Sequence, residues 1–136
     1  MIPARKRVAI LISGRGSNMM SLVEAARAPD YPAEIVVVMS NRPDAPGIAW
    51  AKAQGIPALP LDHKHYESRD HFEGQLQSVL TASKADLVCL AGFMRLMTPG
   101  FVEKWRNRML NIHPSLLPAF KGLHTHERAL AAGVKV

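Results

Sequence analysis

The chain has 136 residues, of which 48% are apolar and 21% are charged, a composition that suits one hydrophobic core and excludes a disordered tail or a fibrous repeat. Its single cysteine, Cys89, excludes an internal disulfide and a four-cysteine zinc site, and the longest apolar stretch, residues 87–94, is much shorter than the roughly 20 residues of a membrane-spanning helix. The formal charge is +6 at pH 7. We therefore expect a single domain over residues 1–136 in a reducing, cytoplasmic setting, with no membrane partner.

Short apolar runs alternate with amphipathic stretches along the chain. The apolar runs predict strands buried on both faces, and the stretches between them have helical spacing. In chain order, the pattern predicts a strand over residues 8–12, a helix closed by Pro29, a strand over 35–39, a helix over 44–54, an extended piece over 57–61, a helix over 68–82, a strand over 87–91, a helix begun by Thr98 and Pro99, a strand over 109–113, a proline-rich loop over 114–123 and a helix over 125–132. The stripes expected to be buried on three of these helices are Met19, Leu22, Val23 and Ala26; Phe72, Leu76, Val79 and Leu80; and Phe101, Val102 and Trp105.

This alternation of strands and helices is typical of α/β proteins. It predicts a doubly wound, mostly parallel sheet with helices on both faces. Sheets of this class bind their ligands at the carboxyl ends of the strands. The segments in which we expect a site are therefore those that follow the strands, residues 13–18, 40–42, 92–97 and 111–118.

The segment after the first strand reads Ser13-Gly-Arg-Gly-Ser-Asn18 and leads into a helix. Glycines let a backbone approach a ligand closely, and free N–H groups at a helix start attract phosphate. The sequence argues against a dinucleotide, because Met19 stands where the fingerprint needs a third glycine and residues 40–41, Ser-Asn, stand where it needs an acid. Two interpretations remain equally good: a compact phosphate site with hydroxyl and amide side chains, or a tight turn in which Ser17 or Asn18 merely caps the helix.

Asn111 and His113 lie two residues apart at the end of a predicted strand, so they share a face, with Ile112 turned into the core. A carboxamide donates to a developing oxyanion and an imidazole moves a proton, a combination that suits acyl transfer to an amine. Neither Ser115 nor Cys89 is placed as a nucleophile, which favours direct transfer over a covalent intermediate. Taken alone, however, the pair fits a hydrogen-bonded strand end better.

The remaining histidines and methionines carry weaker signals. The His-x-His pairs at residues 63–65 and 124–126 have no third ligand at a recognisable spacing, so we expect solvated loop residues and no metal site. His71 has no partner that the sequence identifies. Most methionines are expected in the core, but Met94 and Met97 follow a strand and suit a pocket for a flat ring.

The basic residues are unevenly distributed. Residues 1–86 hold ten basic and nine acidic side chains, and residues 87–136 hold seven and two. Such an excess could attract a polyanion such as RNA. The basic residues are scattered and have no interleaved aromatics, so small anionic ligands explain the excess equally well, as does an acidic portion of the protein outside this chain. We expect no nucleic-acid partner.

Three segments together resemble a known family. The motifs of the phosphoribosylglycinamide formyltransferases, a folate-dependent family of purine biosynthesis, are similar to Ser13-Gly-Arg-Gly-Ser-Asn18, to Leu90-Ala-Gly-Phe-Met-Arg-Leu96, and to Asn111-Ile-His-Pro-Ser-Leu-Leu-Pro118 with Gly122-Leu-His-Thr-His126. The resemblance runs from Val8 to about Gly133. It implies a Rossmann-like formyltransferase fold, of which residues 1–136 are the amino-terminal, nucleotide-binding portion and from which the carboxy-terminal part is absent.

The resemblance implies a direct transfer of formyl from 10-formyltetrahydrofolate, the co-substrate, to the amine of glycinamide ribonucleotide on the route to IMP, with no metal. It assigns ribonucleotide binding to Gly16, Ser17 and Asn18. It makes Asn111 and His113 the catalytic residues, with Asn111 on the formyl oxygen and His113 as the proton donor. The residues that it assigns to the folate are Arg69, Met94, Arg95, Leu96, Met97 and Asn111.

The family has a third catalytic residue, an aspartate that acts on the histidine and orders a water. In the resemblance its position falls past Val136, so we expect residues 1–136 alone to transfer little formyl. The alternative function is a non-catalytic module that holds the ribonucleotide phosphate and transfers nothing. The resemblance leaves a homodimer open.

Overall fold

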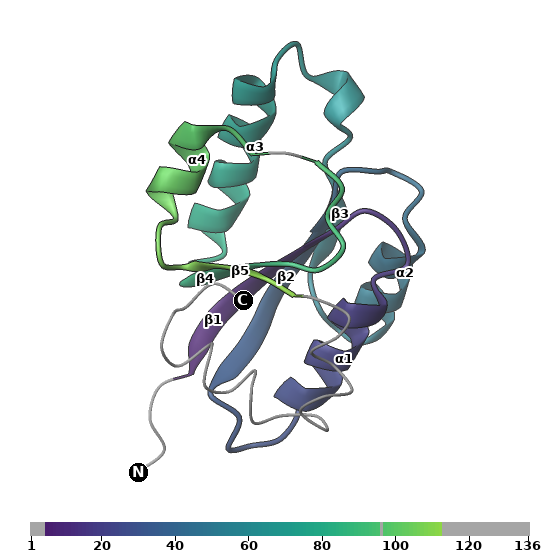
Figure 1. The fold of residues 1–136 in the computed structure, drawn as a ribbon. Helices are drawn as coiled ribbons and strands as arrows, with labels where there is room; N and C mark the ends of the chain where they lie inside the picture. Colours follow the sequence, from purple (N-terminus) through teal and green to yellow (C-terminus); the bar gives the residue numbers. More distant parts are fainter. Residues whose placement is uncertain (1–4, 96, 113–136) are drawn as a thin grey trace.

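The structure, a computed structural model, describes residues 5–95 and 97–112 of the chain. These residues form a five-stranded parallel sheet in the order β3-β2-β1-β4-β5 (Figure 1). The strands are β1 (Lys6–Ile12), β2 (Ala33–Ser40), β3 (Ala58–Pro60), β4 (Leu87–Leu90) and β5 (Met109–Asn111). The helices are α1 (Ser17–Ala26), α2 (Pro46–Ala53), the short 3₁₀ helix η1 (His63–His65), α3 (Arg69–Ala82) and α4 (Pro99–Lys104).

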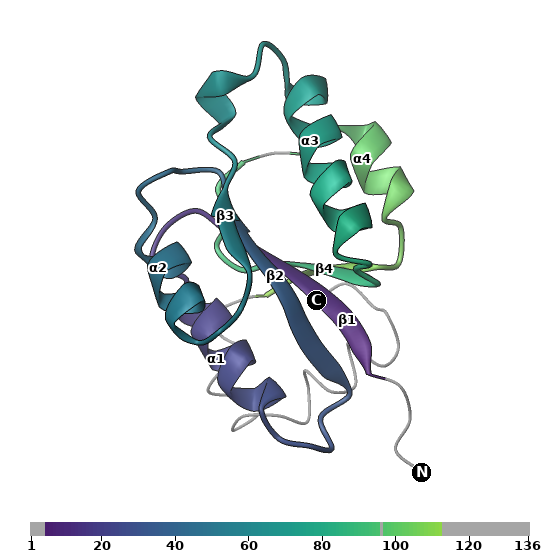
Figure 2. The same ribbon diagram turned by 180° about the vertical axis from the view of Figure 1, so that it is seen from behind.

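The helices cover both faces of the sheet, which confirms the predicted doubly wound α/β class. α1 and α2 lie on one face, and α3 and α4 lie on the other (Figures 1 and 2). In the central strand β1, Val8, Ile10 and Ile12 belong to the core under α1 and α2. Ala9 and Leu11 belong to the core under α3 and α4. Because both faces are covered, β1 is apolar at every one of these positions.

The predicted buried stripes are largely confirmed. All four stripe positions of α1 are buried. In α3 and α4, Val79 and Val102 are only half-buried. Glu73 of α3 is buried although the pattern does not predict it, because its carboxylate accepts two hydrogen bonds from Thr98 and is thus compensated for the loss of water. None of the described helices is long and apolar enough to cross a membrane.

The helix starts follow local capping chemistry. The Ser68 hydroxyl accepts a hydrogen bond from the His71 N–H ahead of α3, and the Thr98 hydroxyl accepts one from the Phe101 N–H ahead of α4. α2 begins at Pro46 rather than at residue 44, because proline suits the first helical position, where its missing N–H leaves no hydrogen bond unmade.

The last predicted elements are only partly tested. The strand predicted over residues 109–113 is present as Met109–Asn111. His113, the loop over 114–123 and the helix over 125–132 lie outside the described residues.

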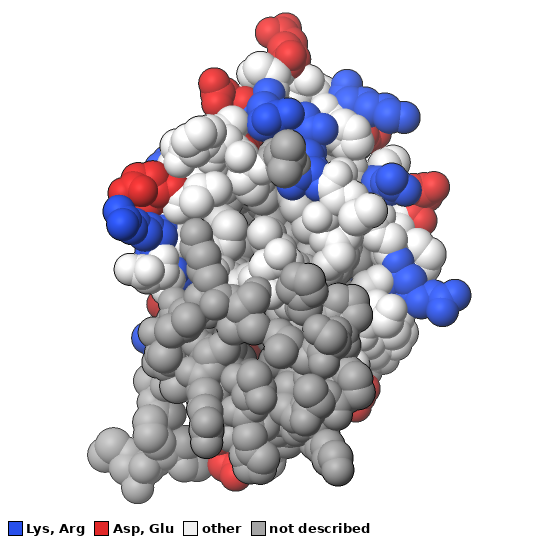
Figure 3. Space-filling model, viewed as in Figure 1, with Lys and Arg blue, Asp and Glu red and all other residues white. Residues whose placement is uncertain are grey.

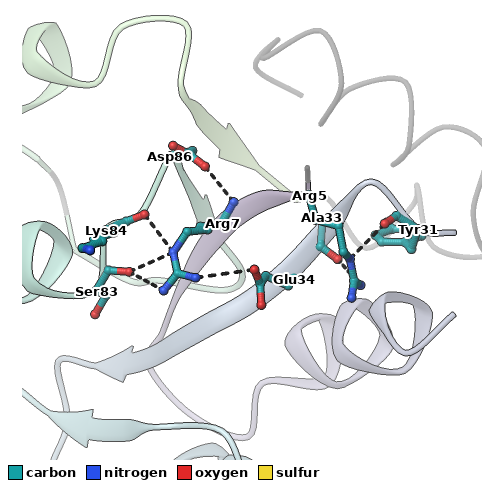
Figure 4. Close-up of polar contacts among 8 residues, drawn as sticks. All are labelled: Arg5, Arg7, Tyr31, Ala33, Glu34, Ser83, Lys84 and Asp86. Carbon is teal, nitrogen blue, oxygen red and sulfur yellow. Dashed lines mark hydrogen bonds and ion pairs between the residues drawn. The ribbon is translucent and has the colours of Figure 1, made fainter. Parts of the chain in front are cut away.

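Arg7 holds the amino edge of the sheet together (Figure 4). Its Nη2 donates to the carbonyl oxygen of Ser83 at 2.9 Å and its Nε to that of Lys84 at 3.2 Å, both in the turn before β4. Its Nη1 lies 3.4 Å from Oε1 of Glu34 in β2. Its backbone N–H donates to Oδ2 of Asp86 at 2.9 Å. One side chain of β1 thus reaches both neighbouring strands.

Arg5 acts in the same way on the other side of the sheet. Its guanidinium donates to the carbonyl oxygens of Ala26, Tyr31 and Ala33. Both arginines of the basic run at residues 5–7 therefore have partners within the fold, so this run needs no anionic ligand to explain it.

We predict that Arg7→Ala lowers the free energy of unfolding by about 1–2 kcal/mol, because it removes hydrogen bonds that join β1 to the turn before β4. The matched control is Arg106→Ala, since Arg106 lies exposed on the surface and pairs with Glu103 one turn away. Its effect should stay within about 0.5 kcal/mol. Urea denaturation followed by circular dichroism measures both, and equal losses would contradict the role of Arg7.

Candidate functional site

The loops after β1, β2 and β4 enclose an open cavity of about 420 Å³, which we call the loop cavity. It lies at the carboxyl ends of the strands, beside the point where the strand order reverses, as the sequence predicts. Its lining residues are Ser13, Gly14, Arg15, Gly16, Ser17, Asn18, Arg42, Ala91, Gly92 and Met94. The fold therefore brings the first loop together with Met94, a residue assigned to a different ligand by the family resemblance.

The start of α1 is an open helix end rather than a capped one. Gly16 precedes the helix with φ 74° and ψ 42°, a left-handed conformation that glycine adopts without strain. No side-chain cap is present at this end, so the alternative in which Ser17 or Asn18 is a plain cap is wrong. Among residues 5–95 and 97–112, no side chain accepts from the first-turn N–H groups, which lie at the positive end of the helix dipole, an arrangement that attracts an anion.

α2 supports this loop through Gly47. The Gly47 N–H donates to the carbonyl oxygen of Gly14 at 3.2 Å. A Cβ at this position would lie 2.4 Å from Cδ1 of Ile12 and 2.7 Å from the carbonyl oxygen of Arg15. Because no side chain fits in that space, Gly47 decides how closely α2 approaches the loop. Nothing in the local sequence distinguishes it from other helical glycines, so only the packing reveals this role.

Ser13 joins the three loops that form the cavity. Its hydroxyl donates to Oδ1 of Asn41 at 2.5 Å and accepts from the Met94 N–H at 2.8 Å. Ser13 and Asn41 are each 3% exposed, so water does not compete for the hydrogen bond between them, whereas the one from Met94 is partly buried. The separation between the loops after β1, β2 and β4 is therefore set by one buried hydroxyl.

A second cavity of about 560 Å³ lies beside the first, and Arg42 lines both. The other residues that line this second cavity are Asn41, Pro43, Asp44, Asp62, His63 and Lys64. The lining carries charges of both signs, unlike the loop cavity, whose charged lining residues are Arg15 and Arg42. The loop cavity is thus the better match for an anion.

The prediction of solvated loop histidines is correct in part for residues 63–65. His65 is exposed, and its Nε2 lies 3.5 Å from Oδ2 of Asp62. For His63 the prediction is wrong: it begins η1, it is half-buried, and its Nδ1 lies 3.1 Å from the carbonyl oxygen of Asn41. His71 also has a partner that the sequence does not identify, the ring of Tyr66, which it meets edge-on with centroids 5.2 Å apart.

β5 ends at the same edge of the sheet. Ile112 is buried, as predicted, and its N–H donates to the carbonyl oxygen of Leu90 at 3.0 Å, whereas Asn111 is exposed. The Asn18 Nδ2 donates to the carbonyl oxygen of Ile112 at 3.5 Å, so the first loop touches the end of β5. Because His113 lies outside the described residues, the face that it shares with Asn111 stays a prediction.

The residues assigned to the folate have different surroundings. Met94 is 76% exposed at the loop cavity, whereas Met97 is half-buried against the core under α3 and α4. The guanidinium of Arg95 lies over the Phe72 ring, 5.4 Å from its centroid. Arg69 is exposed at the start of α3. The remaining assigned residue of this segment, Leu96, is outside the described residues.

Sequence reasoning gave no role to Arg15 and Arg42, although both lie in segments where it expected a site, residues 13–18 and 40–42. Each is exposed and each lines the loop cavity, so the cavity is bordered by two guanidinium groups. The available signal was positional, since each arginine follows a predicted strand by only a few residues. Their contribution depends on β1 and β2 being neighbours in the sheet, which the sequence does not state.

Two other types of centre are absent from the described part of the chain. Burial raises the pKa of the Cys89 thiol to about 12, so at neutral pH it is protonated and is no thiolate nucleophile. Across residues 5–95 and 97–112, no three His, Cys, Asp or Glu side chains gather closely enough to hold a metal ion.

Charges on the face drawn in Figure 3 are mixed. Lys and Arg side chains form separate groups with Asp and Glu among them, and the described surface between them is uncharged.

The comparisons with known proteins agree with the motifs. Residues 6–136 match the formyl transferase family. The chain belongs to this family. This formyl transferase chain is 48% identical over 134 residues to the trifunctional purine biosynthetic protein adenosine-3 of Bos taurus, covering 98% of the chain and 13% of that protein. It is 39% identical over 128 residues to the phosphoribosylglycinamide formyltransferase of Haemophilus influenzae, covering 94% of the chain and 60% of that protein.

The solved structures extend this likeness to the fold. The crystal structure of phosphoribosylglycinamide formyltransferase from Brucella melitensis aligns with a TM-score of 0.80 at 50% identity, covering 96% of this chain and 68% of that one. The formyl transferase chain thus spans about two thirds of this solved relative and smaller shares of the two curated ones. The resemblance inferred from the motifs is confirmed.

We predict that Gly47→Ala destabilises the protein by about 1–3 kcal/mol, because the new methyl group meets both Ile12 and backbone of the first loop. The matched control is Gly74→Ala in α3, where a Cβ would meet nothing within 4 Å. That substitution should stabilise by about 0.5–1 kcal/mol through helix propensity. Thermal or urea unfolding decides, and two changes of the same sign would contradict the packing role of Gly47.

Proposed function

We propose that this chain forms the ribonucleotide-binding and catalytic part of a phosphoribosylglycinamide formyltransferase. The enzyme would transfer the formyl group of 10-formyltetrahydrofolate to the amine of glycinamide ribonucleotide. One observation carries the proposal: the glycine loop before α1, the exposed Met94 and the end of β5 meet at one carboxyl edge of the sheet. Relatives of that name at 39% and 50% identity over nearly the whole chain support it.

The ribonucleotide phosphate binds at Gly16, Ser17 and Asn18 in this proposal. The open start of α1 offers backbone N–H groups, and the Ser17 hydroxyl and Asn18 amide add side-chain donors. The guanidinium groups of Arg15 and Arg42 border the same cavity and balance the charge of a phosphate. The loop therefore supplies donors and positive charge without a bound metal ion.

The folate lies along the segment after β4 in this proposal. Met94 offers an exposed, polarisable side chain at the loop cavity, suited to the flat pterin ring. Arg95, Leu96 and Met97 continue the segment, and Arg69 stands at the start of the neighbouring helix α3. The folate is a co-substrate, so it leaves as tetrahydrofolate after each turnover.

The reaction exchanges one carbon–nitrogen bond for another. The amine of the ribonucleotide attacks the formyl carbon, which places negative charge on the formyl oxygen. The Asn111 amide donates to that oxygen, and the bond from carbon to N10 of the folate then breaks. His113 donates the proton that N10 receives, and the proton that the attacking amine loses returns through solvent water to the His113 imidazole. The cytoplasmic location and the homodimer considered from the sequence stay predictions.

We predict that Gly16→Val weakens binding of glycinamide ribonucleotide and of inorganic phosphate by about tenfold or more. The substitution strains a left-handed position and its Cβ would lie 2.9 Å from Cε of Met19. Arg42→Ala should weaken both ligands through loss of charge. Calorimetry with Arg106→Ala as the control measures the effect. Equal affinities in wild type and Gly16→Val would show that phosphate does not bind at this loop.

We predict that Asn111→Ala and His113→Ala, made in the enzyme that contains this chain, each lower kcat by about a hundredfold or more. Substrate affinity should change much less, because both residues act on the reacting atoms. A formyl-transfer assay with both substrates saturating gives kcat. Near-normal turnover in either variant would exclude that residue from the chemistry.

If wild type binds ribonucleotide but transfers no formyl, the non-catalytic module is the correct alternative.

A further inference from the structure

Residues 94–98 belong to the connection between β4 and α4, and side chains from other elements hold this stretch at Met94 and at Thr98. At the first end, the Met94 N–H donates to Oγ of Ser13 at 2.8 Å. Ser13 is buried, 81 residues away in the sequence, and its own proton is used on Asn41. The hydroxyl thus has its donor and one acceptor position occupied, and it holds the backbone of the segment directly.

At the second end, Glu73 holds Thr98. Oε2 of Glu73 accepts from the Thr98 N–H at 2.7 Å, and Oε1 accepts from the Thr98 hydroxyl. Glu73 is 6% exposed, so its carboxylate makes these hydrogen bonds away from water. Charge-assisted hydrogen bonds of this kind are among the stronger ones in proteins. Burying a carboxylate raises the free energy of the folded state unless hydrogen bonds or an opposite charge compensate it. An apolar residue at position 73 would serve the stability of α3 without that cost.

Between the two anchors, α3 also contacts the segment through Phe72. The ring of Phe72, next to Glu73 in the sequence, lies under the guanidinium of Arg95. Nε of Arg95 is buried without a hydrogen-bond partner in the part of the chain that the structure describes. Met94 is exposed at the other side of the segment. The segment is therefore held at Met94 and at Thr98, and the Met94 side chain remains exposed to a ligand.

We propose that Ser13 and Glu73 are positioning residues that hold the backbone at Met94 and at Thr98 in the places that folate binding requires. The identity of the ligand as a folate rests on the proposed function. The anchoring role of Ser13 and Glu73 is inferred from their hydrogen bonds to Met94 and Thr98. Neither residue is assigned a contact with the folate, so each acts through the backbone of the segment. An ordered segment binds more tightly because the ligand does not have to order it.

The two anchors differ in a way that permits a sharp test. Ser13 borders the phosphate loop, so its replacement can affect both ligands. Glu73 lies in α3 and lines neither cavity at the carboxyl edge. Glu73→Gln keeps the shape of the side chain, but it replaces one acceptor oxygen with an NH2 donor and removes the charge that strengthens both hydrogen bonds to Thr98. It should therefore weaken folate binding while leaving ribonucleotide binding unchanged, a separation that general destabilisation would not produce.

The experiment compares Ser13→Ala and Glu73→Gln with two controls, Ser78→Ala and Glu103→Gln. Ser78 donates within its own helix to Gly74 at 3.1 Å, and Glu103 forms an exposed ion pair. Amide hydrogen exchange by mass spectrometry reports the order of residues 94–98 without any ligand. Calorimetry with tetrahydrofolate under anaerobic conditions, and separately with glycinamide ribonucleotide, reports the two affinities.

We expect exchange in residues 94–98 to accelerate about tenfold in both anchor variants and in neither control. The Kd for tetrahydrofolate should rise about tenfold in both, and the Kd for the ribonucleotide should stay within about twofold of wild type in Glu73→Gln.

Three results would overturn the proposal. Wild-type exchange in both variants would show that the anchors do not hold the segment. Faster exchange with an unchanged Kd for tetrahydrofolate would show that the held shape does not serve the folate. Equal weakening of both ligands in Glu73→Gln would show a general loss of structure. A wild-type protein that binds no tetrahydrofolate would contradict the folate assignment itself, and the exchange data would then judge the anchors separately.

Discussion

The hydroxyl of Ser13 is the contact on which the shape of the site depends. It joins a loop after β1 to Asn41, 28 residues later, and to Met94, 81 residues later. A hydroxyl has one proton, and here that proton goes to the Asn41 carbonyl oxygen while a lone pair receives the Met94 N–H. Because the contact with Asn41 is buried and the contact with Met94 is partly buried, an apolar replacement would remove a hydrogen-bond partner from each of these groups. The three loops therefore keep one arrangement.

The candidate site is made largely from backbone, which explains the importance of two glycines. Gly16 adopts a left-handed conformation at the start of α1, and Gly47 lets α2 approach the same loop to a distance that no Cβ permits. Backbone N–H groups at a helix start bind anions through geometry and the helix dipole rather than through a particular side chain. Arg15 and Arg42 then add charge at the border of the cavity. The anion binding that we propose for this loop would thus depend on how closely two helices approach it.

Polar side chains connect neighbouring elements at both the amino and the carboxyl edge of the sheet. At the amino edge, Arg7 links β1 to the turn before β4 and to β2. At the carboxyl edge, Ser13 links the ligand-binding loops, and Glu73 links α3 to the start of α4. Parallel strands have no direct turns between them, so side-chain links of this kind fix the relative positions of the loops.

The predictions from sequence succeed where the signal is local and fail where a partner is remote. The β-branched runs predict the central strands, and capping by Thr98 is visible because hydroxyl and helix start are neighbours. His63 is misjudged as solvated, since its contact with Asn41 depends on β2 and β3 being adjacent. Glu73 is unexpected in the core because Thr98, which compensates its charge, lies 25 residues away.

The amino-acid sequence by itself determines the class of fold, the glycine loop that follows β1 and the family to which the chain belongs. These follow from hydrophobic periodicity and from motifs that are contiguous in the chain. Only the tertiary structure decides that the helix start is uncapped, that Arg42 joins the loop at one cavity and that Ser13 holds Met94 in place. Those facts depend on which strands lie side by side and how closely their loops pack. A local sequence pattern does not predict distances between residues that are remote in the chain.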